Sequence, residues 1–144
     1  MMIRPTLYTL LLFITLTSCN RQPTAIEYGI SSCHSCKMTI VDQQHAAQVM
    51  TKKGRTYSFD AIECMVRSLE QWKAEELQTI LVTDYTTPRE LIEAENAYYL
   101  ISKAIPSPMG AHLSAFSKKE NRDELASNPI DQKLTWSELK FSVN

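Results

Sequence analysis

The sequence predicts an α+β fold in which two β-β-α-β units pack together, after an N-terminal signal peptide and a polar tether. Two observations predict this fold. Runs of β-forming residues separated by turn residues occur in both halves of the chain. In addition, the pattern Asp60-x-x-Glu63 recurs as Ser117-x-x-Glu120, each time after a phenylalanine, and such capping-box patterns are typical of helix starts. The expected units cover residues 31–87 and 88–144, within a few residues.

The first residues, 1–18, are expected to be a lipoprotein signal peptide. Their apolar run, residues 7–16, is shorter than the roughly 20 residues that a membrane-spanning helix needs. Small residues then stand directly before Cys19, which looks like a lipobox. An ordinary signal peptide, or a short buried helix with an incidental cysteine, are the alternatives. On the lipobox interpretation Cys19 carries the lipid, residues 19–30 form a tether, and the protein faces the periplasm.

The first unit is expected to contain β-strands on both sides of one helix. Polar residues 42–44 and Gly54 mark turns between runs rich in β-formers. After Asp60, apolar residues recur at helical spacing, which predicts a helix that ends near residue 75. Three successive β-branched or aliphatic residues then indicate a buried strand. The expected strands are residues 46–50, 55–59 and 79–83, with a strand-like run at 38–41.

The second unit repeats this scheme. Two prolines, Pro106 and Pro108, stiffen a loop between two strand-like runs. The second helix should start near Ser117, and a last strand should follow Pro129. The expected strands are residues 97–102, 111–116 and 133–136.

The charge balance of the chain argues against nucleic acid as a partner. The chain has 15 basic and 16 acidic residues and a formal net charge of −1. A nucleic-acid-binding domain usually carries a basic patch, and neither the balance nor the distribution of charge indicates one.

Soft sulfur donors in one short segment give the strongest chemical signal. Cys33, Cys36 and Met38 lie within six residues, and thiolates and thioethers prefer Cu(I) to hard cations. If the segment is extended, His34, Cys36 and Met38 share a face; a turn across the segment would instead join Cys33 to Cys36. A CxxC pair also occurs in redox enzymes and in structural disulfides. A zinc site is a further alternative, in which Cys64 and one histidine of this chain would complete the four ligands.

Two further sulfur residues remain open between a structural and a metal-binding role. Met109 follows Pro108 in the stiff loop, where a methionine has little packing to gain, although filling a gap in the core is the more usual role. Cys64 lies about 140° from the centre of the apolar stripe of its helix, given about 100° per residue. It is either a third thiol ligand or a small packed residue.

Taken together, these motifs resemble the NosL family of lipoproteins that accompany nitrous oxide reductase. The resemblance covers nearly the whole chain after Cys19. The matching segments, in order, are the lipobox, Cys33-x-x-Cys36-x-Met38, Phe59-Asp60, Ala97-Tyr98-Tyr99, Pro108-Met109-Gly110 and Trp136-x-Glu138-Leu139.

The resemblance implies a carrier of Cu(I) rather than an enzyme. Its copper would go to the copper-sulfide centre of nitrous oxide reductase or to another copper-accepting protein. The family's ligands fall on Cys36, Met38 and Met109, to which Cys33 or His34 would add one more. One departure is Lys37, since many members have glycine before the motif methionine. An envelope thiol-disulfide oxidoreductase using Cys33 and Cys36 is the alternative function.

Overall fold

The computed structural model describes residues 22–142. The expected signal peptide, the proposed lipid-bearing Cys19 and the start of the tether lie outside these residues. Within the described part, no helix has the length and hydropathy that crossing a bilayer requires.

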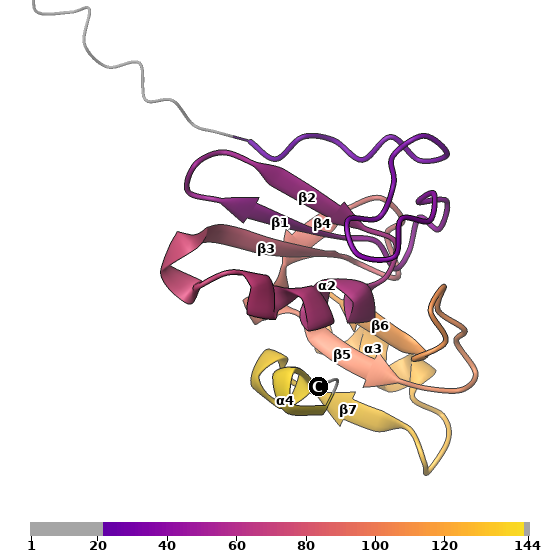
Figure 1. The fold of residues 1–144 in the computed structure, drawn as a ribbon. Helices are drawn as coiled ribbons and strands as arrows, with labels where there is room; N and C mark the ends of the chain where they lie inside the picture. Colours follow the sequence, from indigo (N-terminus) through magenta and orange to yellow (C-terminus); the bar gives the residue numbers. More distant parts are fainter. Residues whose placement is uncertain (1–21, 143–144) are drawn as a thin grey trace, which may run out of the picture.

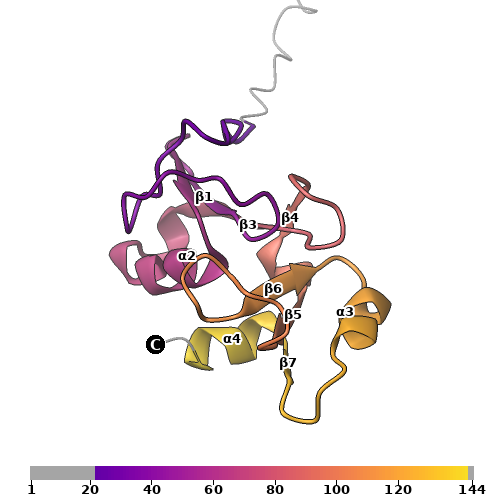
Figure 2. The ribbon, with the colours of Figure 1, turned by 90° about the vertical axis from the view of Figure 1, so that its right-hand side faces the viewer.

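The described chain folds into two antiparallel sheets with short helices between and around them (Figures 1 and 2). The first sheet has the strand order β2-β1-β3-β4, and the second has the order β6-β5-β7. The strands are β1 (Ala47–Thr51), β2 (Thr56–Phe59), β3 (Leu77–Thr83), β4 (Leu91–Glu93), β5 (Tyr98–Ile101), β6 (Leu113–Phe116) and β7 (Gln132–Leu134). The α-helices are α2 (Ile62–Ser68), α3 (Lys119–Leu125) and α4 (Trp136–Ser142), and one-turn 3₁₀ helices are η1 (Leu69–Gln71), η2 (Ala74–Glu76) and η3 (Ala94–Asn96).

The two sheets repeat one topology, which confirms the prediction of two β-β-α-β units. In each unit the first strand is central, the second pairs with it as a hairpin, and the third returns after a helix to its other edge. Thus β1 lies between β2 and β3, as β5 lies between β6 and β7. The short strand β4 comes after the expected boundary at residue 87, yet it pairs with β3 and extends the first sheet.

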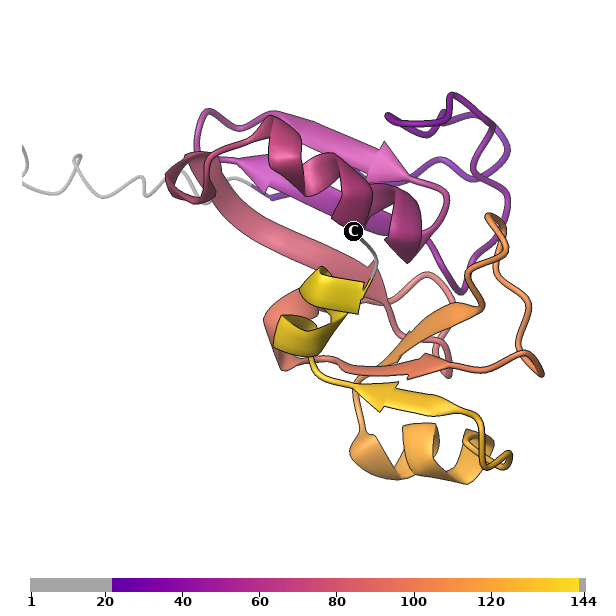
Figure 3. The ribbon, with the colours of Figure 1, turned by 60° about the horizontal axis from the view of Figure 1, so that its bottom comes forward.

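Helix α2 lies between the two units. It packs on β1 and β2 of the first sheet and also contacts β6 of the second (Figure 3). Because both sides are covered, polar as well as apolar residues of its first turn are buried: Glu63 and Met65 are each 0% exposed. In the second unit, α3 packs on β5 and β6, and α4 packs on β5 and β7.

Neither expected capping box forms, so that interpretation of the helix starts is wrong. The N-cap of α2 is Ala61 and that of α3 is Lys118, and neither makes a side-chain capping bond. Glu63 turns toward the other unit, and the Ser117 hydroxyl donates to Asp84 instead. The carboxylate of Asp60 is therefore left free for a different role.

A buried histidine joins the two units elsewhere. In His45, Nδ1 lies 3.0 Å from Asp42 Oδ1 and Nε2 lies 3.1 Å from Ser114 Oγ on β6. This arrangement resembles a Ser-His-Asp triad. However, Ser114 is 0% exposed and His45 only 2%, so no substrate can reach the hydroxyl. The three residues fasten one unit to the other.

Candidate metal centre

A tight turn brings Cys33 and Cys36 together. The Cys33 N–H donates to the Met38 carbonyl (2.8 Å), and the Lys37 N–H donates to the Cys33 carbonyl (3.0 Å). The turn is closed by Lys37, whose φ of 66° lies in the left-handed region that glycine adopts most readily. Many relatives were expected to have glycine here, so lysine keeps the backbone shape that glycine would favour.

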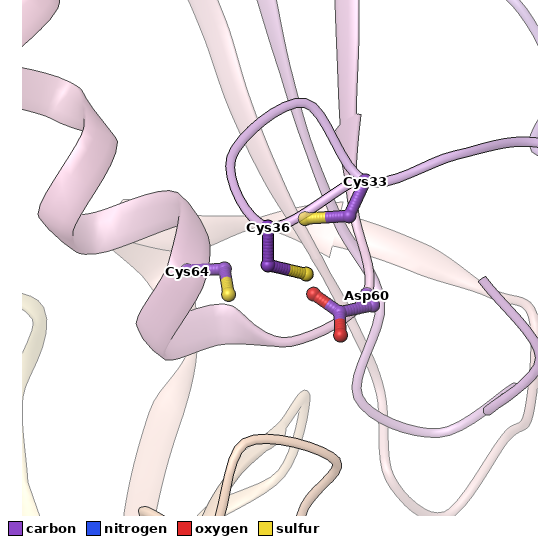
Figure 4. A group of neighbouring side chains, drawn as sticks. All are labelled: Cys33, Cys36, Asp60 and Cys64. Carbon is purple, nitrogen blue, oxygen red and sulfur yellow. The ribbon is translucent and has the colours of Figure 1, made fainter. Parts of the chain in front are cut away.

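The start of α2 adds two more donor groups to these thiols. Asp60 stands just before the helix and Cys64 lies in its first turn, on the side that faces the turn of Cys33 and Cys36 (Figure 4). One ligand atom from each of the four residues, three sulfurs and a carboxylate oxygen, lies within 4.8 Å of all the others. Two segments that are separate in the sequence thus build one compact Cys3Asp cluster, the name used below for Cys33, Cys36, Asp60 and Cys64.

The Cys3Asp cluster is buried and poor in hydrogen bonds. Cys33, Asp60 and Cys64 are 1%, 3% and 4% exposed, and Cys36 is half-buried. Neither carboxylate oxygen of Asp60 accepts a hydrogen bond from an N–H or O–H group within residues 22–142, and the groups that face it are the weakly donating thiols of Cys33 and Cys64. Leaving a buried acceptor unpaired costs about 1–3 kcal/mol, more for a charged one. Such an arrangement is stabilised by a cation placed among the four groups.

Two thiols of the cluster, those of Cys33 and Cys64, are held in their protonated form in the metal-free protein. Burial raises the pKa of Cys33, and the neighbouring Asp60 carboxylate raises it further. Burial likewise raises the pKa of Cys64 far above its usual range, with added contributions from the Asp60 charge and the other two cysteines. No cysteine in residues 22–142 forms a disulfide. A metal ion that binds here must therefore displace protons from the thiols.

His34 lies next to the cluster but is not one of its members. Its ring packs edge-on against Tyr57, with centroids 4.6 Å apart, and also contacts Phe59 and Trp72. Its Nε2 is 3.3 Å from the Gln71 side-chain oxygen. The ring thus lies in an aromatic setting formed by Tyr57, Phe59 and Trp72.

The two methionines proposed as ligands lie at the surface. Met38 is 54% exposed and Met109 is 38% exposed. Met109 stands at the tip of the β5–β6 loop, which lies beside the start of α2 in Figures 1 and 3. The two thioethers are therefore accessible from solvent, whereas the thiols of Cys33 and Cys64 are enclosed.

Two members of the cluster were not assigned from the sequence. Asp60 was interpreted as a helix cap, and Cys64 was left open between ligand and packed residue. Its angle of about 140° from the apolar stripe was the usable signal. Cys64 lies off the hydrophobic face of the helix and one turn after Asp60. Such a thiol is more typical of a metal site than of a core position.

Comparison with known proteins agrees with this architecture. A sequence model of the NosL family matches residues 24–141. Among solved structures, the copper chaperone NosL from Shewanella denitrificans is similar to this chain, with a TM-score of 0.69 and 19% sequence identity. The alignment covers 82% of this chain and 95% of that one. No curated protein matches the sequence.

Proposed function

The chain belongs to the NosL family, and on that premise we propose that it binds Cu(I) and hands it to a copper-accepting protein. The observation that carries this proposal is the convergence of three thiols on one point, within 4.8 Å of one another and of the Asp60 carboxylate. Thiolates are soft ligands that select Cu(I) over hard cations. The similar fold of a protein described as a copper chaperone supports the same metal.

Charge indicates which thiols bind the ion. Three thiolates and a carboxylate around one monovalent cation would leave a net charge of −3 in a buried place, which low dielectric disfavours. Two thiolates leave −1 before Asp60 is counted. Cys33 and Cys36 supply the two, because Cys36 is the most exposed of the three thiols and shares one turn with Cys33. Burial raises the pKa of Cys64 far above its usual range, so Cys64 stays protonated. Met38 and Met109 add thioethers, which are neutral.

Transfer then proceeds by exchange of ligands. An incoming ion first meets Met38 and Met109, which are exposed, and then moves to the thiolates of the Cys33–Cys36 turn. Delivery reverses the order. Neutral thioethers bind the ion less tightly than thiolates, so they suit the steps at which a partner must take it over.

Competition with a chromophoric Cu(I) chelator tests the binding. Reduced protein should bind one equivalent of Cu(I), and Cys33→Ser and Cys36→Ser should each weaken binding by at least about a hundredfold, since losing even an outer-sphere partner of a metal ligand costs 10- to 100-fold. Ser35→Ala, in the same turn, is the matched control. Met109→Leu should weaken binding less, with Met50→Leu, a buried methionine on β1, as its control. Unchanged affinity in Cys36→Ser would refute the assignment.

Zinc is the second metal that the cluster favours, because Cys3Asp offers four ligands of the kinds that structural zinc sites use. The two metals make opposite demands on Asp60. A tetrahedral Zn²⁺ site needs its oxygen as fourth ligand, whereas Cu(I) held by sulfur does not. Asp60→Asn should therefore abolish zinc binding and leave most of the Cu(I) affinity. Metal analysis of protein purified anaerobically from cells supplied with both metals decides which ion is held.

The alternative of a thiol-disulfide oxidoreductase is less well supported. Such enzymes place CxxC at a helix N-terminus, where the pKa of the attacking thiol is lowered. Here the motif forms a turn between Ser32 and Thr39, with no helix after it, and the pKa of Cys33 is raised. An insulin-reduction assay separates the two functions, since a copper carrier should show no turnover.

We further propose that nitrous oxide reductase is the acceptor and that a lipid on Cys19 holds the carrier at the periplasmic side of the membrane. A tether raises the local concentration of a carrier near membrane-associated partners. Cells lacking this protein should make nitrous oxide reductase with less copper, and Cys36→Ser should not restore it. Mass spectrometry of the purified protein tests the lipid, which Cys19→Ala should remove.

A further inference from the structure

The carboxylate of Glu63 is an unusual group at the interface of the two units. It is 0% exposed, it precedes Cys64 in the first turn of α2, and it is not a member of the Cys3Asp cluster. Its Oε1 accepts hydrogen bonds from the Ser107 hydroxyl (2.7 Å) and the Ala111 N–H (3.3 Å), both in the β5–β6 loop. Burying a charged side chain costs free energy, so a buried glutamate between the two units indicates a specific role for its carboxylate.

The loop that Glu63 contacts is the one that carries Met109. Ser107 and Ala111 stand on either side of the Pro108-Met109-Gly110 tip. The tip is a turn closed by the Gly110 N–H on the Ser107 carbonyl (3.0 Å), and Gly110 has a φ of +77°. The Ser107 hydroxyl also accepts from the His112 N–H (2.9 Å). One glutamate oxygen therefore holds both ends of a preformed turn.

We propose that Glu63 is a positioning residue that fixes the Met109 turn relative to the thiols, so that the Met109 thioether can join the ion they bind. This inference rests on the proposed Cu(I) function. Glu63 and Cys64 are neighbours on one helical turn, so their separation is set by the helix backbone. Through Ser107 and Ala111, the same turn sets the place of the loop. The carboxylate thereby links a ligand of the first unit to a ligand of the second.

The chemistry explains why a carboxylate occupies this position. Its oxygen accepts two hydrogen bonds at once, one from a hydroxyl and one from a backbone N–H, and charge strengthens both. The thioether of Met109 has no charge and binds weakly, so its contribution depends on being held in place beforehand. A loop that moved freely would lose most of that contribution to ordering entropy.

A double-mutant cycle tests the inference. Met109→Leu is made in the wild type and in the Glu63→Ala variant, and Cu(I) affinity is measured by chelator competition. If Glu63 positions Met109, Met109→Leu weakens binding in the wild type by about tenfold, the scale on which loss of an orienting partner also weakens metal binding. The same substitution has little further effect when Glu63 is absent, because the Met109 contact is then already lost. Additive effects of the two substitutions would overturn the inference. Glu70→Ala, on the exposed side of the following 3₁₀ turn, is the matched control.

Two further measurements separate positioning from folding. Ser107→Ala removes the partner hydroxyl without touching α2, so it serves if Glu63→Ala is unfolded, and it should give the same loss of coupling. Glu63→Gln keeps an acceptor oxygen and should retain part of the coupling between position 63 and Met109. X-ray absorption of the copper-loaded protein should show one sulfur fewer in Glu63→Ala than in the wild type, and an equal number would also refute the inference. If the wild type binds no Cu(I), the proposed function itself fails instead.

Discussion

Asp60 and Cys64 face each other across the first turn of α2, and a carboxylate oxygen of one lies within 4.8 Å of the sulfur of the other. Within residues 22–142 no N–H or O–H group donates to the acid, which faces only thiols, and the Cys64 thiol keeps its proton. A carboxylate in this setting destabilises the metal-free fold and favours any state that brings a cation close. The two residues therefore connect the stability of the protein to its metal content.

The first prediction concerns Asp60. Replacing it by asparagine removes a buried charge, so the free energy of unfolding of the metal-free protein should rise by about 1 kcal/mol, within the range measured for unpaired buried groups. The stabilisation gained on adding Cu(I) should fall by no more than about the same 1 kcal/mol, because the sulfur ligands that hold the ion remain. Urea unfolding with and without the metal measures both quantities. A metal-free variant less stable than the wild type would show that the carboxylate has a structural partner instead.

Cys64 should make the stability of the metal-free protein depend on alkaline pH. Its pKa is raised in the folded state above the ordinary value of 9.0. The folded state therefore holds the proton more tightly than the unfolded chain, and this contribution is present below about pH 9 and lost as the pH rises above it. Unfolding in urea at pH 7.5 and 10 should show the loss.

Comparison with Cys64→Ala isolates this contribution. The variant should lose less stability over the same pH interval than the wild type. Some loss should remain, because burial also raises the pKa of Cys33 and Tyr99. An equal slope in the two proteins would mean that the Cys64 thiol does not titrate with unfolding.

The strands were predictable because turns mark their ends locally. Gly54 adopts a φ of 85° between β1 and β2, a conformation for which glycine is suited, and the hairpin follows as expected. The run at 38–41 was expected to be strand-like, but only an isolated bridge between Ser32 and Thr39 forms there. Residues 38–41 close the turn of Cys33 and Cys36 through the hydrogen bond from the Cys33 N–H to the Met38 carbonyl, so they do not continue as a strand despite their β propensity.

The cluster was only half predictable, because helix α2 is covered on two sides. Sequence periodicity identifies one apolar face, and it assigns the rest of the helix to solvent. Glu63 and Cys64 lie off that face. Glu63 is buried against the β5–β6 loop and Cys64 against the turn of Cys33 and Cys36, and no local pattern in the sequence indicates either contact. The capping-box pattern shows the same limit. It fails at Asp60 and Ser117, yet at Thr135-x-x-Glu138 the Thr135 N–H does donate to the Glu138 carboxylate (2.7 Å).

Lys37 gives a prediction about the thiol turn. With a φ of 66°, this residue pays the strain of the left-handed region, about 1 kcal/mol for a residue other than glycine. Lys37→Gly should relieve the strain and leave the turn intact, so Cu(I) affinity should stay the same or rise. Lys37→Val should weaken both stability and Cu(I) binding, because a β-branched side chain is poorly tolerated there. Equal behaviour of the two variants, by urea unfolding and chelator competition, would show that the turn does not depend on this conformation.

The link between His45 and Ser114 should contribute to stability and not to metal binding. Ser114 lies on β6 and His45 lies just before β1, and neither residue belongs to the Cys3Asp cluster. Ser114→Ala leaves His45 Nε2 without its partner in a buried place, so the free energy of unfolding should fall by about 1–3 kcal/mol. Ser32→Ala, at an exposed position beside the thiol turn, should cost little and serves as the control. Cu(I) affinity at a temperature where both variants are folded should equal that of the wild type. A loss of affinity in Ser114→Ala would mean that the arrangement of the two units, and not only the local turn and helix, sets the geometry of the thiols.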